Sequence, residues 1–333
     1  MKRTIAFLMI FTLLLCAAGC HKTPDIPATD TLVAAMDTEM TLRLYGDTDN
    51  AAAKALTEEI LRLDAVFSPT SEQSALFALN RFKTSSDPDL TALAAQACDL
   101  GVRTDGALDI TLAPLSALWG FTGESYYLPT EEEVAQTLLR TGADKYTVSD
   151  SGVQLNGDAA LDFGALAKGY AADLCRACLE KTGIAALLSL GGNVQTVGQK
   201  PDGTPWRIGV QDPQDPQKVL LMLDVEGTKS VVTSGDYQRY FDYEGKHYCH
   251  IFDPATGCPV QKDLRSVTVI ADSGTLADGL STALFVMGFD AACVHWLQSS
   301  DFEAIFVTKD GKIYVTQGLA ESVSECEFTV VVR

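Results

Sequence analysis

The chain has 333 residues, with 25 Lys or Arg against 44 Asp or Glu, a formal net charge of −19 and 47% hydrophobic residues. This composition is typical of a globular protein with one large domain or two, and it excludes a disordered or collagen-like chain. The negative charge argues against a nucleic-acid partner, because a net anion releases no counterions from phosphates, but it allows a small anionic ligand whose charge is masked locally.

The first twenty residues have the pattern of an export signal. Lys2 and Arg3 precede an uncharged, mostly apolar run over residues 4–20. This run is shorter than the roughly 20 apolar residues that a bilayer span needs. A basic start, an apolar stretch and a small-residue end are instead typical of a cleaved secretory signal.

The end of this run, Leu15-Cys16-Ala17-Ala18-Gly19-Cys20, resembles the bacterial lipobox, in which cleavage before the cysteine exposes a thiol for lipid attachment. We therefore predict a lipoprotein signal over 1–19, lipidation at Cys20, a tether over 20–31 and a single folded body over 32–333. The body is expected outside the cytoplasm, anchored to a bacterial membrane. An ordinary cleaved signal without a lipid is the alternative.

The first block of the body, about residues 31–155, is expected to be mostly helical after a short strand at 40–45. Apolar residues at Leu56, Ile60, Leu63 and Phe67 share one helical face. Asp87-Pro88 marks another helix start. Thr130 and Glu133 form a capping box for a further helix, which Gly142 could close.

The second block is richer in strands. Short apolar runs bounded by Gly, Pro or Asp predict strands at 185–190, 206–210, 219–225, 231–233, 247–252 and 267–271. Helices are expected at 165–181, 275–287 and 290–298, and a hairpin at 303–316 around Asp310-Gly311. The pattern predicts an α+β fold with mixed, largely antiparallel sheets packed with helices.

Seven cysteines remain after Cys16 and Cys20, an odd number at wide spacings that does not indicate a disulfide framework. Cys175 and Cys178 form a C-x-x-C within a predicted helix. No second pair accompanies them to complete a zinc site. We therefore expect buried thiols rather than zinc or redox chemistry.

Two helix starts carry candidate chemistry. The glycine-rich stretch from Leu161 to Asp173 includes Lys168 and could hold a phosphate at the start of a helix, although an ordinary helix start is equally compatible. Further on, Asp278 and Thr282 lie four residues apart and share a helix face. A carboxylate, a hydroxyl and a nearby carbonyl suit Mg²⁺, whereas helix capping is the alternative.

Two strand ends are further candidates. The double glycine before Asn193 would allow the backbone to approach a flat ligand or a neighbouring strand. His250 lies at a tight turn, where it could accept a proton or bind phosphate, or have only a structural role. The chain contains neither Gly-x-Ser-x-Gly nor His-Glu-x-x-His, so the common hydrolase signatures give no support.

Taken in order, these stretches resemble the ApbE family, flavin transferases that attach FMN to proteins with FAD as donor. The resemblance runs from about Met36 to Met287 and rests on the following ordered matches: Met36-Asp37-Thr38, Ser71-Glu72 with Leu79-Asn80, Asp105 to Thr111 through Pro114-Leu115 to Trp119-Gly120-Phe121, Asp162 to Asp173, Gly191-Gly192-Asn193, Thr233 to Tyr237, His250 to Gly257, and Ala277-Asp278 to Thr282. It implies a T-fold-like, single catalytic body.

The resemblance also implies a set of site residues. FAD contacts would fall on Met36, Ala107, Leu108, Asp109, Asp162, Lys168 and Phe252, and metal ligands on Ala165, Asp278, Ser281 and Thr282. Lys168, and His250 as a base, would take part in catalysis. The family usually has Met-Gly-Thr where this chain has Met36-Asp37-Thr38, which bears on the local flavin geometry, and no contact is assigned at residues 67–69.

The implied activity is Mg²⁺-dependent transfer of FMN from FAD to a threonine hydroxyl of an acceptor protein, with release of AMP. The acceptor would be an exported flavoprotein of a respiratory or ion-pumping complex. Two alternatives remain open, an Mg²⁺-dependent FAD pyrophosphatase on the same site and a lipoprotein that only binds flavin.

Overall fold

The computed structural model describes residues 26–123 and 125–333. The predicted signal over 1–19 and the lipidation site Cys20 therefore lie outside the described residues. The first described strand begins at Ala28, so the last four residues of the predicted tether, 28–31, belong to this strand instead. None of the helices in the described ranges is long and apolar enough to cross a membrane.

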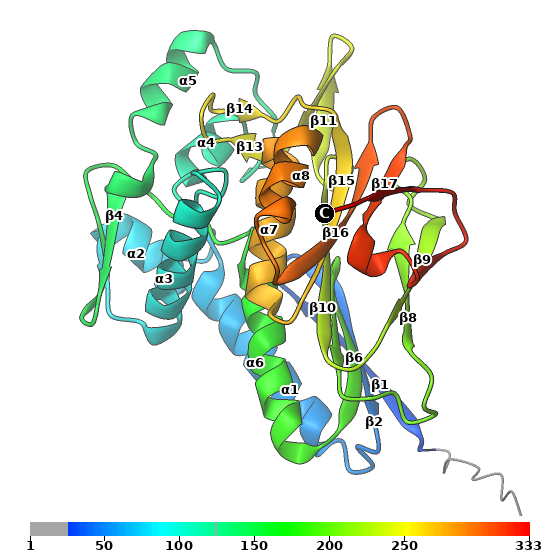
Figure 1. The fold of residues 1–333 in the computed structure, drawn as a ribbon. Coiled ribbons are helices and arrows are strands. Elements are labelled where there is room, and N and C mark those ends of the chain that lie inside the picture. Colours follow the sequence, from blue (N-terminus) through cyan, green and yellow to red (C-terminus); the bar gives the residue numbers. More distant parts are fainter. Residues whose placement is uncertain (1–25, 124) are drawn as a thin grey trace, which may run out of the picture.

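One nine-stranded sheet forms the centre of the molecule (Figure 1). Its neighbours pair antiparallel throughout, except for the parallel pair β17–β19 at one edge. The strands in spatial order are β1 (Ala28–Ala35), β2 (Thr38–Tyr45), β6 (Ala185–Leu190), β7 (Asn193–Val197), β10 (Lys229–Gly235), β15 (Leu264–Ala271), β16 (Phe302–Thr308), β17 (Ile313–Thr316) and β19 (Thr329–Val331).

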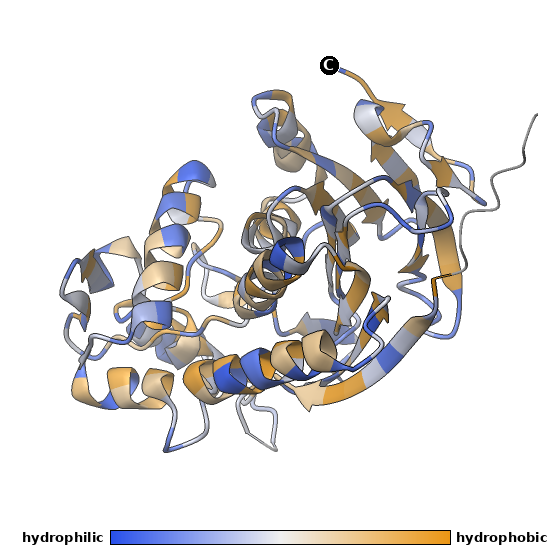
Figure 2. Ribbon diagram, turned by 90° about the horizontal axis from the view of Figure 1, so that it is seen from below, coloured by the Kyte–Doolittle hydropathy of each residue, from blue (hydrophilic) through white to orange (hydrophobic). Residues whose placement is uncertain are grey.

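Helices cover one face of this sheet. Figure 2 shows the helices and the sheet from below, coloured by the hydropathy of each residue. The most buried is α7, where eleven of fourteen residues are buried. The helices are α1 (Ala51–Phe67), α2 (Ala75–Phe82), α3 (Pro88–Arg103), α4 (Ala113–Leu118), α5 (Glu131–Leu138), α6 (Ala167–Thr182), α7 (Gly274–Met287) and α8 (Phe289–Leu297), with 3₁₀ turns at Ala143–Lys145 and Gln317–Leu319.

Four small sheets complete the fold. One packs against the other face of the central sheet through an apolar layer that includes Ile208, Leu221 and Ile270. The small sheets are β8 (Trp206–Gln211) with β9 (Val219–Val225) and β18 (Val323–Ser324); β3 (Thr84–Ser85) with β4 (Tyr146–Ser149) and β5 (Gly152–Leu155); β11 (Tyr240–Tyr243) with β12 (Lys246–Cys249); and β13 (Phe252–Asp253) with β14 (Cys258–Pro259).

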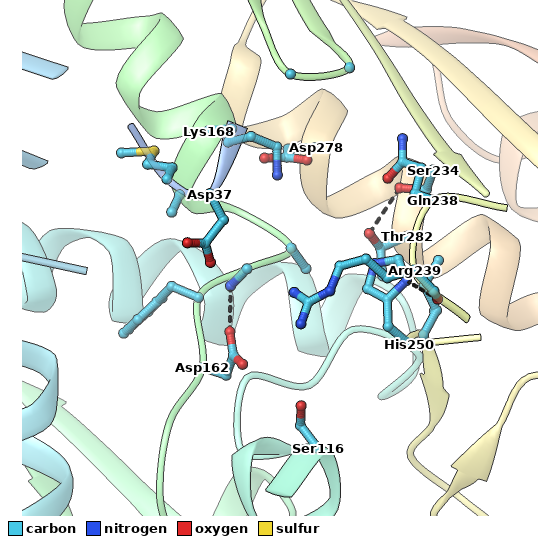
Figure 3. A pocket seen from close by; sticks show the side chains of 18 of the residues that line it. Asp37, Ser116, Asp162, Lys168, Ser234, Gln238, Arg239, His250, Asp278 and Thr282 are labelled. Atoms are coloured by element: carbon cyan, nitrogen blue, oxygen red, sulfur yellow. Dashed lines mark hydrogen bonds between the residues drawn. The ribbon is translucent and has the colours of Figure 1, made fainter. Parts of the chain in front are cut away.

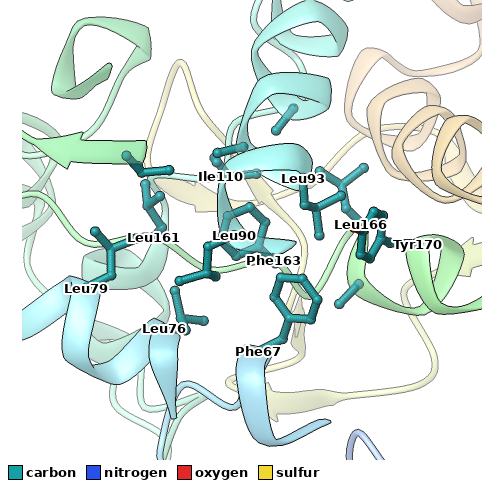
Figure 4. Packing of buried hydrophobic residues seen from close by; sticks show 14 of the residues in the cluster. Phe67, Leu76, Leu79, Leu90, Leu93, Ile110, Leu161, Phe163, Leu166 and Tyr170 are labelled. Atoms are coloured by element: carbon teal, nitrogen blue, oxygen red, sulfur yellow. The ribbon is translucent and has the colours of Figure 1, made fainter. Parts of the chain in front are cut away.

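The helical part of the chain has its own core, which packs on α6 (Figure 4). Leu63 and Phe67 of α1, Leu76 of α2 and Leu90 of α3 converge there on Phe163, and all five are buried. This core holds the loops before α4 and α6 rigidly against the central sheet. The α+β prediction with largely antiparallel sheets is confirmed, and the predicted apolar face of α1 is buried.

Two local predictions are wrong. The run 247–252 is not one strand, because β12 ends at Cys249 and the His250 N–H donates across to the Arg239 carbonyl, so the chain turns before β13. Gly142 does not close α5, which ends at Leu138. Tight turn bonds already satisfy the last carbonyls of α5, and the Gly142 N–H donates to Thr111 Oγ1.

Candidate functional site: a polar cavity at the starts of α6 and β7

A cavity of about 640 Å³ opens beside the starts of α6 and β7, and Figure 3 shows its polar lining. The turn between β1 and β2, the end of α1 and the loop before α4 contribute to its wall. The end of β10 and the middle of α7 contribute further side chains, together with the turn at His250. The site therefore combines segments from the whole length of the folded body.

Two helices cross at glycines to build the floor of the site. A Cβ on Gly169 would lie 2.2 Å from the Gly274 carbonyl oxygen, and one on Gly274 would lie 2.4 Å from the Gly169 carbonyl oxygen. This close crossing places the start of α6 against α7. The Gly169 N–H donates to Asp278 Oδ2 at 2.8 Å, so the carboxylate of one helix takes the free N–H of the other.

Asp278 is a buried carboxylate, only 4% exposed. Burial raises its pKa, and the charge of Lys168 and the Gly169 N–H act in the opposite direction. Asn193 is 3% exposed and lines the same cavity, and its Nδ2 atom has no hydrogen-bond partner within the described part of the chain. Charge and hydrogen-bonding capacity thus remain available to a ligand.

The donor atoms around Asp278 fit a hard divalent cation. Because the Gly169 N–H is bonded to Asp278, it does not close a helical turn on Ala165, and no hydrogen bond to the Ala165 carbonyl is found among the described residues. Thr282 lies one turn after Asp278 and also lines the cavity. A carbonyl, a carboxylate and a hydroxyl are the oxygen donors that Mg²⁺ prefers.

A hydroxyl cluster lies behind these donors. Ser234 Oγ is 2.7 Å from Ser281 Oγ and 3.1 Å from Thr282 Oγ1, and Ser281 donates to the Asp278 carbonyl at 2.8 Å. Ser281 is fully buried and does not line the cavity. Its role as a metal ligand stays a prediction, and its observed contacts position Ser234 and Asp278.

Arg239 fixes His250 and reaches into the cavity itself (Figure 3). The backbone N–H of His250 donates to the Arg239 carbonyl at 3.0 Å, and the ring atom Nδ1 of His250 lies 3.2 Å from the same oxygen. A carbonyl can only accept, so Nδ1 carries the proton and Nε2 has a lone pair. Desolvation and the charge of Arg239 lower the pKa of His250 to about 4, so the imidazole is neutral at pH 7.

Two cations of the cavity have no carboxylate partner. Within the described residues neither Lys168 nor Arg239 lies within 4.0 Å of an Asp or Glu oxygen, and the Arg239 guanidinium donates to the Phe121 carbonyl. The carboxylates of the lining are Asp37, Asp64, Asp109, Asp162 and Asp278. An anion entering this acidic cavity therefore meets its free positive charge at Lys168 and Arg239.

The fold brings the predicted site residues together, with Ser281 as the one that lies behind the wall. The cavity is lined by Met36, Ala107, Leu108, Asp109, Asp162, Ala165, Lys168, His250, Phe252, Asp278 and Thr282. Sequence reasoning missed Arg239, whose position follows a matched motif. It also assigned no contact at residues 67–69, although Phe67, Ser68 and Pro69 line the cavity.

Asp37 occupies the turn between β1 and β2 in a left-handed conformation. Met36 has φ 50° and Asp37 has φ 56°, while Ala35 pairs with Thr38 across the two-residue turn. Such hairpin turns favour glycine, asparagine and aspartate. Aspartate therefore accommodates the backbone at this point, but it adds a carboxylate that faces the cavity (Figure 3).

The cysteines take no part in this site. Cys175 is buried and Cys178 is exposed, and all seven described cysteines are free thiols. Burial raises the pKa of Cys175 to about 12, so it stays protonated. The described ranges contain no group of three or more His, Cys, Asp or Glu that could hold a metal, so a metal at this cavity would depend on carbonyl and hydroxyl oxygens as well.

The fold and the cavity define an α+β protein with a site suited to a phosphate-bearing ligand, and comparison with known proteins agrees with this class. The ApbE family model matches residues 36–306. The FAD:protein FMN transferase of Salmonella typhimurium is 33% identical over an alignment 331 residues long. The alignment covers 94% of this chain and 94% of that protein. The chain belongs to the ApbE family.

Solved structures of the same family share the fold. The ApbE protein of Thermotoga maritima superposes with a TM-score of 0.84 at 32% identity, covering 90% of this chain and all of that one. The flavin transferase ApbE of Vibrio cholerae gives a TM-score of 0.77 at 27% identity, covering 89% and 100%.

Proposed function

We propose that the chain is an FAD:protein FMN transferase, which moves the FMN part of FAD to a hydroxyl group of an acceptor protein and releases AMP. The observation that carries this proposal is that Lys168, Arg239 and the buried Asp278 line one cavity, where the Gly169 N–H of α6 holds the Asp278 carboxylate. Relatives that cover most of the chain carry the same name.

Different residues of the cavity would have different roles in such a reaction. Lys168 and Arg239 would bind the pyrophosphate of FAD, because they are the cations of this acidic cavity that have no carboxylate partner among the described residues. Asp278, Thr282 and the Ala165 carbonyl would hold Mg²⁺. When bound, this ion would neutralise phosphate charge as the phosphoanhydride bond breaks.

His250 would act as the base. Its Nε2 lone pair would accept the proton of the acceptor hydroxyl, while the hydroxyl oxygen bonds to the FMN-side phosphorus and the bond to the AMP phosphate breaks. The proposed acceptor group is a threonine, and the proposed acceptor is an exported flavoprotein of a respiratory or ion-pumping complex. Positioning and electrostatics supply most of the catalysis in such phosphoryl-type transfers.

The place of the reaction follows from the leader sequence. We propose that the chain is exported, cleaved before Cys20 and anchored by a lipid, so that the catalytic body works outside the cytoplasm. Mass spectrometry of the mature N-terminus tests this. A lipid-modified Cys20 is the expected result, and an unmodified terminus elsewhere would contradict it.

Transfer can be tested with the full chain, FAD, MgCl₂ and an acceptor domain that the Vibrio cholerae flavin transferase labels in a parallel reaction. The expected result is AMP release together with flavin fluorescence that remains on the denatured acceptor. Formation of FMN and AMP without labelled acceptor would identify a pyrophosphatase, and FAD binding without turnover would identify a flavin-binding protein.

A further inference from the structure

A row of stacked aromatic rings continues from the cavity to the surface. We call the residues Tyr126, Phe241, Tyr243 and Tyr248 the aromatic rim. Tyr126 stacks on Phe241 with ring centroids 4.8 Å apart, and Phe241 stacks on Tyr248 at 5.0 Å. Tyr243 follows Phe241 on the same face of β11, because residues two apart on a strand point the same way.

The rim is continuous with the reaction cavity through Phe121. The Phe121 ring lies 5.2 Å from Tyr126, 5.8 Å from Phe241 and 5.7 Å from Phe252. Both Phe121 and Phe252 line the cavity. A molecule that enters the cavity along these rings would therefore pass over the rim.

Part of the rim is open to solvent. Tyr126 is 50% exposed and Tyr243 is 47% exposed, and Leu128, close by in sequence, is 39% exposed. Exposed, rigid tyrosines give a large contact area at a small entropic cost, and clusters of this kind are typical of protein-binding surfaces. Packing of the hairpin β11–β12 would account for Phe241 and Tyr248, but it does not account for the exposed rings.

The charges around the rim are mostly negative. Glu244 lies in the turn of the hairpin that carries the rim, opposed there by Lys246, whereas Asp242 points to the other face of β11 and contacts His247. α5, whose Val134 belongs to the apolar cluster on which Phe241 and Tyr248 pack, begins with the exposed residues Glu131 and Glu132. A partner that fits this surface would place apolar side chains on the rings and basic side chains against the carboxylates.

We propose that the aromatic rim is the docking surface for the acceptor polypeptide, which presents apolar and basic residues beside its target hydroxyl. This inference rests on the proposed transferase function, because an acceptor hydroxyl must reach a phosphorus atom inside the cavity while the rest of the acceptor stays outside. Figure 1 shows β11 and α5 at the same end of the molecule, away from the first strand.

The test compares acceptor kinetics with flavin binding. The double variant Tyr126→Ser/Tyr243→Ser should lower kcat/KM for the acceptor domain at least about tenfold, mainly through KM, whereas the Kd for FAD stays within about twofold. Phe82→Ser is the matched control, since Phe82 is 68% exposed on α2 and does not line the cavity. It should change neither quantity.

A second variant removes charge without touching a ring. Glu131→Gln/Glu132→Gln should lower kcat/KM for the acceptor about threefold and flatten its decrease with added NaCl, because screened attraction mostly affects association. Thermal unfolding of each variant shows whether it is folded. The charge variant keeps the inference testable if the tyrosine variant does not fold.

Different results identify different errors. If both variants label the acceptor as efficiently as the wild type, the rim is not the docking surface, although the transferase function stands. If the wild type itself labels no acceptor while the Vibrio cholerae enzyme does, the proposed function and this inference both fail. Loss of a dimer in the tyrosine variant, with unchanged acceptor kinetics, would assign the rim to a second copy of the chain and overturn the inference.

Discussion

Asp278 shows how a single residue can be kept for binding at the expense of stability. Burial raises its pKa above the ordinary value of 3.8, so the folded protein disfavours the charged form of this carboxyl more than water does. Because the folded-state pKa is raised, the contribution to stability is most favourable below about pH 4 and is lost as the pH rises through the folded-state pKa.

Asp278→Asn should therefore stabilise the metal-free protein by about 1 kcal/mol at pH 7, because it removes a carboxyl whose charged form burial disfavours and keeps an acceptor for the Gly169 N–H. The gain should shrink toward pH 4. Urea unfolding with EDTA at both pH values measures it. In the same variant, MgCl₂ should no longer raise the unfolding midpoint, and a wild-type response to MgCl₂ would show that the metal assignment is wrong.

His250 gives a prediction about pH. Its pKa of about 4 means that the imidazole is already deprotonated throughout the neutral range. The acid limb of kcat/KM should accordingly lie near pH 4, and His250→Gln should reduce kcat about 10²- to 10⁴-fold at every higher pH with little change in the Kd for FAD. An acid limb near pH 6.5 would instead indicate an imidazole that titrates as in water.

The crossing of α6 and α7 is the contact between elements on which the cavity depends most. Gly169→Ala should destabilise the protein by about 3 kcal/mol, because the new Cβ would overlap the Gly274 carbonyl. Gly123→Ala is the matched control, since an added Cβ there meets no atom within 4 Å. Urea unfolding of both variants decides the point, and equal midpoints would mean that the helices can separate without cost.

At the scale of helices and strands, the sequence correctly predicts those features that depend on neighbouring residues alone. The predicted strands 185–190 and 219–225 have the observed bounds, and the Thr130 capping box is present with both of its hydrogen bonds. The errors occur where a distant contact decides. His250 donates to the Arg239 carbonyl eleven positions earlier, and Gly142 donates to Thr111 thirty-one positions earlier. The local pattern of residues indicates neither partner.

For the whole molecule, the net charge of −19 should slow the approach of FAD. The association rate, followed by flavin fluorescence at constant Mg²⁺, should rise roughly threefold between 20 and 200 mM NaCl, as salt screens the repulsion between two anions. Riboflavin, which lacks the phosphates, is the control and should show no such change. An FAD rate that falls with salt would mean that local cations dominate the approach.

The folding of the whole molecule explains which residues of the site could be predicted from the sequence and which could not. Matched motifs predicted the lining residues that carry recognisable chemistry, such as Lys168 and Asp278. The Arg239 guanidinium donates to the carbonyl of Phe121, more than a hundred positions away in the sequence, and both residues line the cavity. Similarly, Phe67 lines the cavity because the helical core fixes the end of α1 there. Such placements depend on tertiary contacts, which cannot be deduced from a single sequence.

If Cys20 carries the proposed lipid, the early start of β1 would limit how far the enzyme can work from a membrane. Only eight peptide bonds separate Cys20 from Ala28, where the rigid fold begins. Fully extended, they span less than about 30 Å. A lipid on Cys20, as proposed, would hold the body close to the bilayer. Acceptors would then have to bring their target threonine to the membrane surface, which favours membrane-bound substrates over freely diffusing ones.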